Sequence, residues 1–322
     1  MANIYVTRLI PEKGLNMLRE AFGESSIEIN PNDRVLTREE LLEKVKGRDA
    51  ILSLLTENMD GAVMDAAGPQ CKIISNYAVG YNNIDVKAAS ERNIMVTNTP
   101  GVLTEATSDM AIALMFAVAR RIPEGDRMMR AHEYKGWAPM MLLGQQITGK
   151  TLGIVGTGRI GSEIGTKMHK GFGMNILYFD RSAKEDFEKE TGAKKVDLET
   201  LCKESDIITI NLNYTPETHH IIDEKVLNMM HEGTILINTA RGPIIDENAL
   251  VKALQEKKIF GAGLDVYENE PAMAEGLDKL DNTVLAPHLG SATWDARTKM
   301  SEIAAQNIIE ALNGKKPQFV VN

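Results

Sequence analysis

Short apolar runs alternate with helix-forming segments along most of the chain, and this alternation constrains the fold more than any other feature. Nearly continuous apolar runs of about five residues are typical of strands that helices cover on both faces. Strands that alternate with helical segments favour parallel sheets joined by crossover helices. Because the runs form an early and a late series, the sequence predicts an α/β fold with two doubly wound parallel sheets. The early runs are 4–10, 50–55, 72–76 and 94–98, and the late runs are 151–155, 175–179, 206–212, 234–238, 261–266 and 283–286.

Length and charge narrow the class of protein. The 322 residues correspond to about two domains. A hydrophobic fraction of 43% and a charged fraction of 25% are typical of globular proteins. The 36 basic and 45 acidic residues give a net charge of −9, which repels phosphate backbones and anionic lipids. We therefore expect neither nucleic acid nor a membrane as a partner.

The cysteine content and the first residues both favour a cytoplasmic protein. Cys71 and Cys202 are too few for a disulfide framework. Residues 1–8 contain a short apolar stretch that charge soon interrupts, unlike the longer apolar core of a secretory signal. We expect this stretch to form the first strand.

Residues 110–119 are apolar on every side of a helix. They are too few to span a bilayer, which takes about 20 residues. Because such a helix must be buried all round, we interpret it either as an interface helix between domains or subunits, or as the core of one subunit. The segment of about 101–150 is accordingly predicted to be the dimerisation helix and arm of a homodimer. Its methionines are interpreted as packing residues, since methionine fills irregular gaps: Met128, Met129, Met140 and Met141.

The glycine-rich segment 156–161 follows the run 151–155 and opens a helix-like stretch. Three glycines with this spacing allow a tight turn, close approach of the backbone to a pyrophosphate, and close packing of helix on strand. The amino terminus of the helix also favours phosphate. Asp180 stands 19 residues past Gly161, where a carboxylate binds a ribose 2′-hydroxyl. This carboxylate favours NAD over NADP, although the adjacent Arg181 could accommodate a 2′-phosphate.

Polar side chains follow three later strands, at the edge where a doubly wound sheet places its chemistry. Arg241 lies in the segment 238–242, Glu270 in 265–271 and His288 in 286–293. Taken singly, each is more often a solvated or structural residue. The remaining histidines lie in polar or helical contexts and are interpreted as structural: His132, His169, His219, His220 and His231.

Taken together, the glycine-rich segment followed by Asp180, Arg241, Glu270 and His288 resembles the D-isomer-specific 2-hydroxyacid dehydrogenase family. The resemblance covers essentially the whole chain. Three segments are similar to the family's arginine, glutamate and histidine motifs, namely 238–242, 265–271 and 287–293. Residues 75–85 look like the substrate loop of the glyoxylate and hydroxypyruvate reductase branch.

The resemblance implies reduction of a 2-oxo acid with a defined role for each residue. Arg241 would clamp the carboxylate and polarise the ketone, because a guanidinium is always charged and binds carboxylates bidentately. His288 would protonate the nascent alkoxide as general acid, and Glu270 would orient it. The remaining substrate contacts would be backbone N–H groups of Val79 and Gly80, and Ser291.

The same resemblance implies a division of the chain into two Rossmann-like domains. It does not imply the coenzyme, because this branch of the family is mixed in coenzyme preference, so the expectation of NADH rests on Asp180. Residues 100–288 would form the dinucleotide-binding domain, whereas 1–99 and 289–322 would form a discontinuous substrate domain. The residues expected to contact the coenzyme are Gly156, Gly158, Arg159, Ile160, Gly161, Asp180, Thr239, Ala240, Asp265 and His288.

The substrate remains the open question at this level. Glyoxylate or hydroxypyruvate is expected from residues 75–85, but the same catalytic set would serve D-lactate, D-3-phosphoglycerate or bulkier D-2-hydroxy acids. Glyoxylate reductases of this branch often carry a tryptophan in the arm where Met141 stands, with Trp137 nearby.

Two further activities fit the same fold. An NADH-sensing protein like the corepressors of this superfamily would keep the catalytic residues, but the chain lacks a disordered tail or basic patch for partners. A formate dehydrogenase would need no general acid, so the glutamate and histidine pair argues against it.

Overall fold

The computed structural model describes residues 2–322, which form two compact units. The discontinuous unit contains the chain up to Leu103 together with Ala292–Asn322, and the continuous unit is Thr104–Ser291. The boundaries thus lie three to four residues beyond the ones expected from the sequence. The difference has a local cause, because Thr104 already begins the first helix of the continuous unit and Thr293 caps the last helix of the chain.

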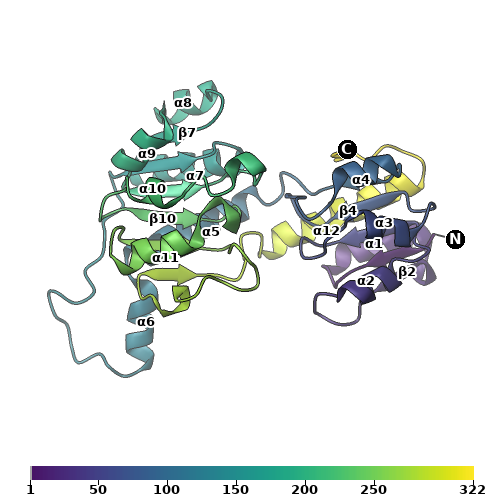
Figure 1. The fold of residues 1–322 in the computed structure, drawn as a ribbon, viewed down its shortest axis with the longest axis horizontal. Helices are drawn as coiled ribbons and strands as arrows, with labels where there is room; N and C mark the ends of the chain where they lie inside the picture. Colours follow the sequence, from purple (N-terminus) through teal and green to yellow (C-terminus); the bar gives the residue numbers. More distant parts are fainter. Residues whose placement is uncertain (1) are drawn as a thin grey trace. The chain divides into compact units, whose positions relative to one another are not determined.

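The discontinuous unit is built on a five-stranded parallel sheet (Figure 1). The order of its strands is β2-β1-β3-β4-β5. Its strands are β1 (Ile4–Val6), β2 (Ile27–Ile29), β3 (Ala50–Ser53), β4 (Ile73–Asn76) and β5 (Met95–Thr97). Its helices are α1 (Glu12–Phe22), η1 (Glu24–Ser26), α2 (Arg38–Lys44), α3 (Gly61–Ala67), α4 (Val86–Glu91) and α12 (Trp294–Leu312).

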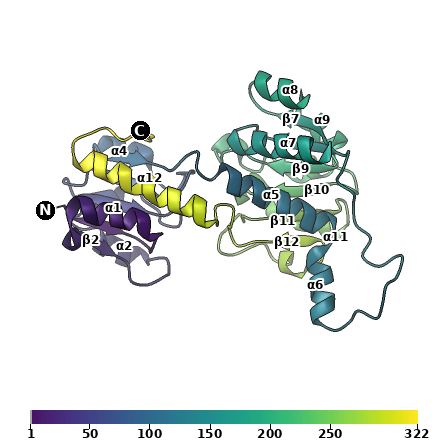
Figure 2. The ribbon, with the colours of Figure 1, turned by 180° about the vertical axis from the view of Figure 1, so that it is seen from behind.

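Helices cover both faces of this sheet. The buried side chains of α1 and α12 pack on one face, and those of α2, α3 and α4 pack on the other. The last helix of the chain completes the first layer by lying against α1 (Figure 2). A Cβ at Gly14 would stand 2.3 Å from the carbonyl oxygen of Ser301, so the close approach of these helices requires glycine at this position.

The continuous unit is built on a seven-stranded parallel sheet in the order β12-β11-β10-β9-β6-β7-β8. Its strands are β6 (Thr151–Val155), β7 (Asn175–Phe179), β8 (Lys194–Lys195), β9 (Ile207–Ile210), β10 (Ile235–Asn238), β11 (Gly261–Leu264) and β12 (Thr283–Leu285). Its helices are α5 (Thr104–Ala119), α6 (Ile122–Arg130), α7 (Arg159–Phe172), α8 (Glu185–Thr191), α9 (Leu198–Glu204), η2 (Pro216–Thr218), α10 (Glu224–Leu227), η3 (Gly242–Ile244), α11 (Glu247–Gln255) and η4 (Leu277–Lys279).

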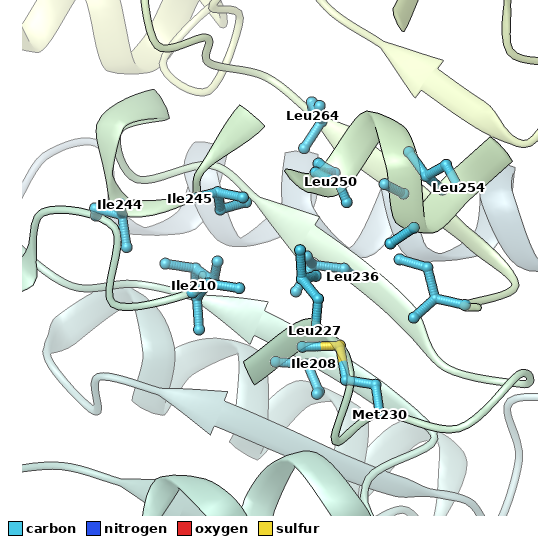
Figure 3. Packing of buried hydrophobic residues seen from close by; sticks show 14 of the residues in the cluster. Ile208, Ile210, Leu227, Met230, Leu236, Ile244, Ile245, Leu250, Leu254 and Leu264 are labelled. Atoms are coloured by element: carbon cyan, nitrogen blue, oxygen red, sulfur yellow. The ribbon is translucent and has the colours of Figure 1, made fainter. Parts of the chain in front are cut away.

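This sheet is also covered on both faces. Figure 3 shows the core on the side of α10 and α11, where Leu250 and Leu254 meet side chains of the central strands, among them Leu236. The opposite face is covered by α5 and α7, which contribute Met115 and Met168 to a second core. Both sheets are therefore doubly wound, as predicted.

Helix α5 packs closely on β11 because two glycines of that strand leave room for it. A Cβ at Gly263 would stand 3.0 Å from Cβ of Leu114, and one at Gly261 would stand 2.8 Å from a methyl group of Val118. The outer side of α5 is less covered, since Ile112 and Phe116 are only half-buried. This helix thus contributes to the core of one unit and leaves part of its apolar surface exposed.

Helix α6 and the loop after it extend away from the sheet of the continuous unit (Figures 1 and 2). No residue of α6 is buried. Met129 and Met140 are 58% and 76% exposed, so the interpretation as packing residues is wrong for these two methionines within this chain. Met128 and Met141 are half-buried. Large apolar side chains in this arm face solvent instead, most clearly Trp137, which is 80% exposed.

The sequence did not predict β2 and β8. Strand β2 is a half-buried strand at the edge of the five-stranded sheet, with a glutamate at its centre. Strand β8 consists of two exposed lysines at the edge of the seven-stranded sheet. Neither presents the continuous apolar run that marks a strand covered on both faces. None of the helices in residues 2–322 has the length and apolar content needed to cross a membrane.

Candidate active site

The carboxyl ends of the strands in the continuous unit meet at one edge of its sheet, because all seven strands are parallel. Strand β6 lies between β7 and β9, and the chain runs from β6 to β7 on one side before returning to β9 on the other. Such a reversal of strand order opens a crevice at the carboxyl edge, where doubly wound proteins bind ligands. The predicted site residues of this unit lie at this edge, on loops or in the first turn of α7 (Arg159–Phe172).

The glycine-rich segment forms the turn from β6 into α7. Gly156 has a φ of 96°, a conformation that glycine adopts without strain. A Cβ at Gly161 would stand 2.2 Å from the carbonyl oxygen of Gly156, so glycine is also required where helix and turn meet. Around Gly158, in contrast, no atom lies within 4 Å of the position a Cβ would take.

This open space fits a dinucleotide pyrophosphate. Gly158 is the N-cap of α7 and supplies no side-chain acceptor. The N–H groups of Arg159 and Ile160 in the first turn therefore lack intrahelical partners and can donate to phosphate oxygens. The three glycines thus have the environments that the sequence pattern predicts: Gly156 forms the tight turn, Gly158 faces open space, and Gly161 packs closely against the turn.

Asp180 follows β7 directly and is bound to the glycine-rich turn. The backbone N–H and the hydroxyl of Thr157 both donate to Asp180 Oδ2 at 2.9 Å. Burial opposes ionisation of Asp180, but these hydrogen bonds and the nearby Lys184 outweigh it and lower its pKa. The carboxylate is therefore ionised and fixed beside the phosphate cradle, as a group that binds ribose hydroxyls should be.

The loop after β9 also reaches this crevice, and our sequence analysis missed it. A Cβ at Gly156 would stand 3.0 Å from the backbone of Asn211 and 2.9 Å from the side chain of Leu212. The loop thus lies beside the glycine-rich turn at the reversal of strand order. The sequence signal that could have identified this loop is a pair of polar residues at the end of an apolar run, Asn211 and Asn213. The loops after β10, β11 and β12 were identified by polar residues in the same position.

The loop after β10 carries three predicted site residues. Asn238 braces it, because its side chain accepts from the N–H of Ala240 at 3.0 Å and donates to the carbonyl of Arg241 at 2.9 Å. The hydroxyl of Thr239 is buried without a hydrogen-bond partner in residues 2–322. An unpaired buried hydroxyl is costly, so a polar ligand at this loop would stabilise it. Burial lowers the pKa of the Arg241 guanidinium, against the opposing charge of Glu270.

Glu270 and His288 form a hydrogen-bonded pair. The loops after β11 and β12 bring Glu270 Oε2 to 2.9 Å from His288 Nδ1. The other carboxylate oxygen of Glu270 accepts from the N–H of Tyr267 at 3.1 Å. This arrangement leaves Nε2 as the ring nitrogen of His288 that can face a substrate.

The charge state of Glu270 follows from its neighbours. Burial opposes its ionisation. Three neighbours favour ionisation and hold the pKa of Glu270 below its ordinary value: His288 through its hydrogen bond and charge, Tyr267 through its N–H, and Arg241 through its charge. An ionised glutamate at Nδ1 stabilises a protonated imidazole. The pair can therefore hold a proton that His288 donates from Nε2.

Asp265 holds the histidine loop in place. Its two carboxylate oxygens accept from the N–H groups of Leu289 and Gly290 at 2.6 and 2.7 Å. Its own carbonyl accepts from the N–H of His288 at 2.9 Å, and burial raises the pKa of its carboxyl group. The sequence predicted only a coenzyme contact for Asp265, and these bonds show that it also fixes the backbone around His288.

Val79 and Gly80 lie in the discontinuous unit, after β4. Side-chain amides of Asn98 and Asn76 donate to their carbonyl oxygens at 2.8 and 2.9 Å. No group in residues 2–322 accepts a hydrogen bond from either N–H, so both can donate to an anion. Ser291 is the last residue of the continuous unit and is half-buried.

The structure thus brings together a dinucleotide cradle, a fixed cation and a histidine with an ionised carboxylate partner. These groups can bind a nicotinamide coenzyme, bind a carboxylate and exchange one proton with an oxygen atom. That combination suits hydride transfer to or from a small carboxylic acid with an oxygen at the neighbouring carbon.

Comparison with known proteins agrees with this chemistry. Residues 112–290 match the family model described as D-isomer specific 2-hydroxyacid dehydrogenase, NAD binding domain. A glyoxylate reductase of Thermococcus litoralis is 51% identical over 99% of this chain and 96% of its own.

Two solved structures are similar over nearly their whole length. An NADPH-dependent glyoxylate/hydroxypyruvate reductase from Sinorhizobium meliloti in complex with citrate has a TM-score of 0.82 at 32% identity, covering 100% of this chain and 98% of its own. A D-lactate dehydrogenase from Aquifex aeolicus, complexed with NAD and lactic acid, has a TM-score of 0.86 at 28% identity, covering 99% of both chains.

Proposed function

This chain belongs to the D-isomer-specific 2-hydroxyacid dehydrogenases, oxidoreductases that use NAD or NADP, and we propose that it reduces glyoxylate or hydroxypyruvate with NADH. The observation that carries the proposal is the hydrogen-bonded pair of His288 and Glu270 on the same sheet edge as Arg241 and the glycine-rich turn. The identity to a glyoxylate reductase supports the substrate class.

Each side chain has a role in this reaction. The glycine-rich turn and Asp180 would hold the coenzyme, which would supply a hydride to C2 of the 2-oxo acid. Arg241 binds the substrate carboxylate and polarises the ketone, since a buried guanidinium stays charged and binds carboxylates bidentately. Nε2 of His288 donates a proton to the oxygen that becomes the hydroxyl, and Glu270 stabilises the protonated ring from Nδ1. The product is the D-2-hydroxy acid.

The remaining substrate contacts are part of the same proposal. Val79 and Gly80 bind the substrate carboxylate through their backbone N–H groups, and Ser291 lines the substrate pocket. Ionised Asp180 supports NADH as the coenzyme, because its charge repels a 2′-phosphate. The similarity to an NADPH-dependent enzyme makes a direct comparison of the two coenzymes necessary.

A homodimer is proposed from the exposed apolar surface of the continuous unit. Ile122, Met129, Trp137 and Met140 are all more than half exposed, and exposed apolar surface of this kind marks an interaction site. A second copy of the chain would cover it together with the outer side of α5. We place the protein in the cytoplasm, where reduced nicotinamide coenzymes and free thiols such as Cys71 and Cys202 persist.

The test is a panel of 2-oxo acids assayed with NADH and with NADPH. The panel includes glyoxylate, hydroxypyruvate, pyruvate, 3-phosphohydroxypyruvate and a branched or aromatic 2-oxo acid, and chiral chromatography identifies the product. We expect the highest kcat/KM with glyoxylate or hydroxypyruvate and with NADH. A higher kcat/KM with pyruvate or with bulkier acids would show that the proposed substrate is wrong. No turnover on any acid of the panel would refute the proposed function.

A further inference from the structure

The continuous unit contains a second pair of a histidine and a carboxylate, which the proposed mechanism does not use. His220 Nε2 lies 2.8 Å from Glu268 Oε1. Their side chains are 32% and 20% exposed, so solvent screens the interaction only in part. The backbone N–H of His220 donates to the carbonyl of Pro243 at 2.9 Å. His220 therefore binds the loop after β10 through its backbone and the loop after β11 through its ring.

Glu268 also joins the loops after β10 and β11 directly. Its backbone N–H donates to Glu247 Oε2 at 3.2 Å, and its Oε2 accepts from the backbone N–H of Glu247 at 3.4 Å. Glu247 is the first residue of α11 and is buried. The two glutamates thus form a reciprocal pair in which each side chain binds the other's backbone, although 21 residues separate them.

The backbones of these loops are in contact as well. A Cβ at Gly242 would stand 1.9 Å from the carbonyl carbon of Tyr267, so no other residue type fits there without moving the two loops apart. Gly242 follows Arg241 directly, and Glu268 lies two residues before Glu270. We call the contacts among His220, Gly242, Glu247 and Glu268 the junction. It lies next in the chain to Arg241 and Glu270.

Glu247 is present at this junction despite an unfavourable environment. Its Oε1 is buried and has no hydrogen-bond partner in residues 2–322. Burial raises the pKa of its carboxyl group, and the charges of Glu268 and Glu270 act in the same direction. A buried, incompletely paired carboxyl group does little for stability, so its contribution is better sought in the geometry it imposes.

We propose that Glu268 is a positioning residue that, together with His220 and Glu247, fixes the distance between Arg241 and Glu270. The inference rests on the proposed function, which gives Arg241 and Glu270 their roles. Without the bonds of Glu268, the two loops keep their backbone contact at Gly242 but lose the side-chain bonds that fix their spacing. Misplacement of reacting groups by about 1 Å costs up to about 100-fold in rate, so the effect falls on kcat.

The experiment compares Glu268→Ala, Glu268→Gln and His220→Gln with the intact protein. His231→Gln is the matched control, because His231 precedes β10 and so lies at the opposite edge of the sheet, and its Nδ1 accepts from the nearby N–H of Gly233. We expect Glu268→Ala to lower kcat about 10- to 100-fold while the Kd for NADH, measured by fluorescence, stays within about twofold. Glu268→Gln keeps the shape and one acceptor oxygen for the N–H of Glu247, and its NH2 group can donate to a neutral His220 ring, so it should recover most of kcat.

The pairing of His220 with Glu268 is tested by a double-mutant cycle. If the two act as one unit, His220→Gln combined with Glu268→Ala lowers kcat no further than Glu268→Ala alone. Additive losses would show that His220 acts independently of Glu268. A kcat of Glu268→Ala within about twofold of the intact protein, or a loss of NADH affinity in step with kcat, would overturn the positioning role.

Amide hydrogen exchange provides a readout that does not depend on turnover. In Glu268→Ala, segments 241–247 and 265–271 should exchange faster, whereas the glycine-rich segment 156–161 should not change. If the intact protein reduces none of the 2-oxo acids, the proposed function fails and this comparison alone decides the inference. Unchanged exchange in both segments would then refute it.

Discussion

His288 Nδ1 lies 2.9 Å from Glu270 Oε2, although 18 residues separate the two in the chain. Parallel strand order makes this contact possible, because β11 and β12 are neighbours and both loops leave the sheet at the same edge. The carbonyl and carboxylate of Asp265 then fix the backbone at His288, Leu289 and Gly290. The geometry of the pair formed by His288 and Glu270 thus depends on a second carboxylate, that of Asp265, which directly follows β11.

Replacement of His288 by alanine tests the assignment of the general acid. Removal of a positioned proton donor costs about 10² to 10⁴ in turnover, while the phosphate cradle and Asp180 remain in place. We therefore expect kcat to fall by that factor and the Kd for NADH, followed by fluorescence titration, to change little. An equal loss of NADH affinity would show that His288 is a structural residue, and His231→Gln should leave both quantities unchanged.

The coenzyme preference is tested at Asp180. Its carboxylate accepts two hydrogen bonds from Thr157 and is ionised at neutral pH, and in the proposed function it binds ribose hydroxyls and repels a 2′-phosphate. Asp180→Ala should weaken NADH binding and strengthen NADPH binding, which lowers the ratio of the two affinities by about tenfold or more. Direct titration with both coenzymes measures this ratio. An unchanged ratio would mean that another group selects the coenzyme.

Much of the fold follows from the sequence because buried parallel strands have an unmistakable composition. Strands β4, β6 and β10 carry no charged residue and are buried along all or nearly all of their length, since helices cover both faces of the sheets. Strands β2 and β8 lie at sheet edges and carry charged residues. Their pairing is decided by the neighbouring strand rather than by their own pattern, which is why periodicity did not predict them.

The candidate site was predictable where a motif has a fixed spacing and unpredictable where contacts are distant in sequence. The glycine-rich segment and Asp180 follow from spacing alone. The bonds that Asp265 makes with Leu289 and Gly290, and the pair of His220 and Glu268, join residues from different loops. Such pairs depend on strand order, which the composition of each segment does not reveal.

Two glycine substitutions separate folding from coenzyme binding. Gly242→Ala places a methyl group 1.9 Å from the carbonyl carbon of Tyr267, and overpacking of this kind destabilises by about 1–3 kcal/mol or more. Gly158→Ala meets no atom within 4 Å and should change stability by no more than about 0.5 kcal/mol, but its methyl group occupies space where the pyrophosphate approaches.

Thermal unfolding and NADH titration distinguish the two variants. Gly242→Ala should lower the Tm by several degrees, whereas Gly158→Ala should keep the Tm and lose NADH affinity. Gly171→Ala, at an exposed helical position with open space around it, serves as the control. It should leave NADH affinity unchanged and should not lower the Tm, because alanine favours a helix over glycine. Full NADH affinity in Gly158→Ala would contradict the assignment of the phosphate cradle.

The pH dependence of stability should report the ionisation of Glu270. Its pKa in the folded protein lies below the ordinary value of 4.5, so its ionised form stabilises the fold above that pH. As pH falls through the lowered pKa, the carboxylate is protonated and this contribution is lost. Urea unfolding between about pH 3 and 7 should therefore show a steeper fall in the free energy of unfolding for the intact protein than for Glu270→Gln. Parallel curves would contradict the ionised state assigned to Glu270.

The arm of the continuous unit provides the test of the proposed homodimer. Trp137 and Met140 are 80% and 76% exposed, and an apolar side chain gains about 1.5–3 kcal/mol when it is removed from water. A second copy that covers them should therefore depend on both. Sedimentation equilibrium is expected to find a dimer for the intact chain and a shift towards monomer for the variant carrying Trp137→Ser and Met140→Ser.

The exposed pair Lys203 and Glu199, on α9 of the same unit, supplies the control: Lys203→Ser should leave the association unchanged. A monomeric intact chain would refute the dimer, and a double variant that associates as strongly as the intact chain would place the interface elsewhere.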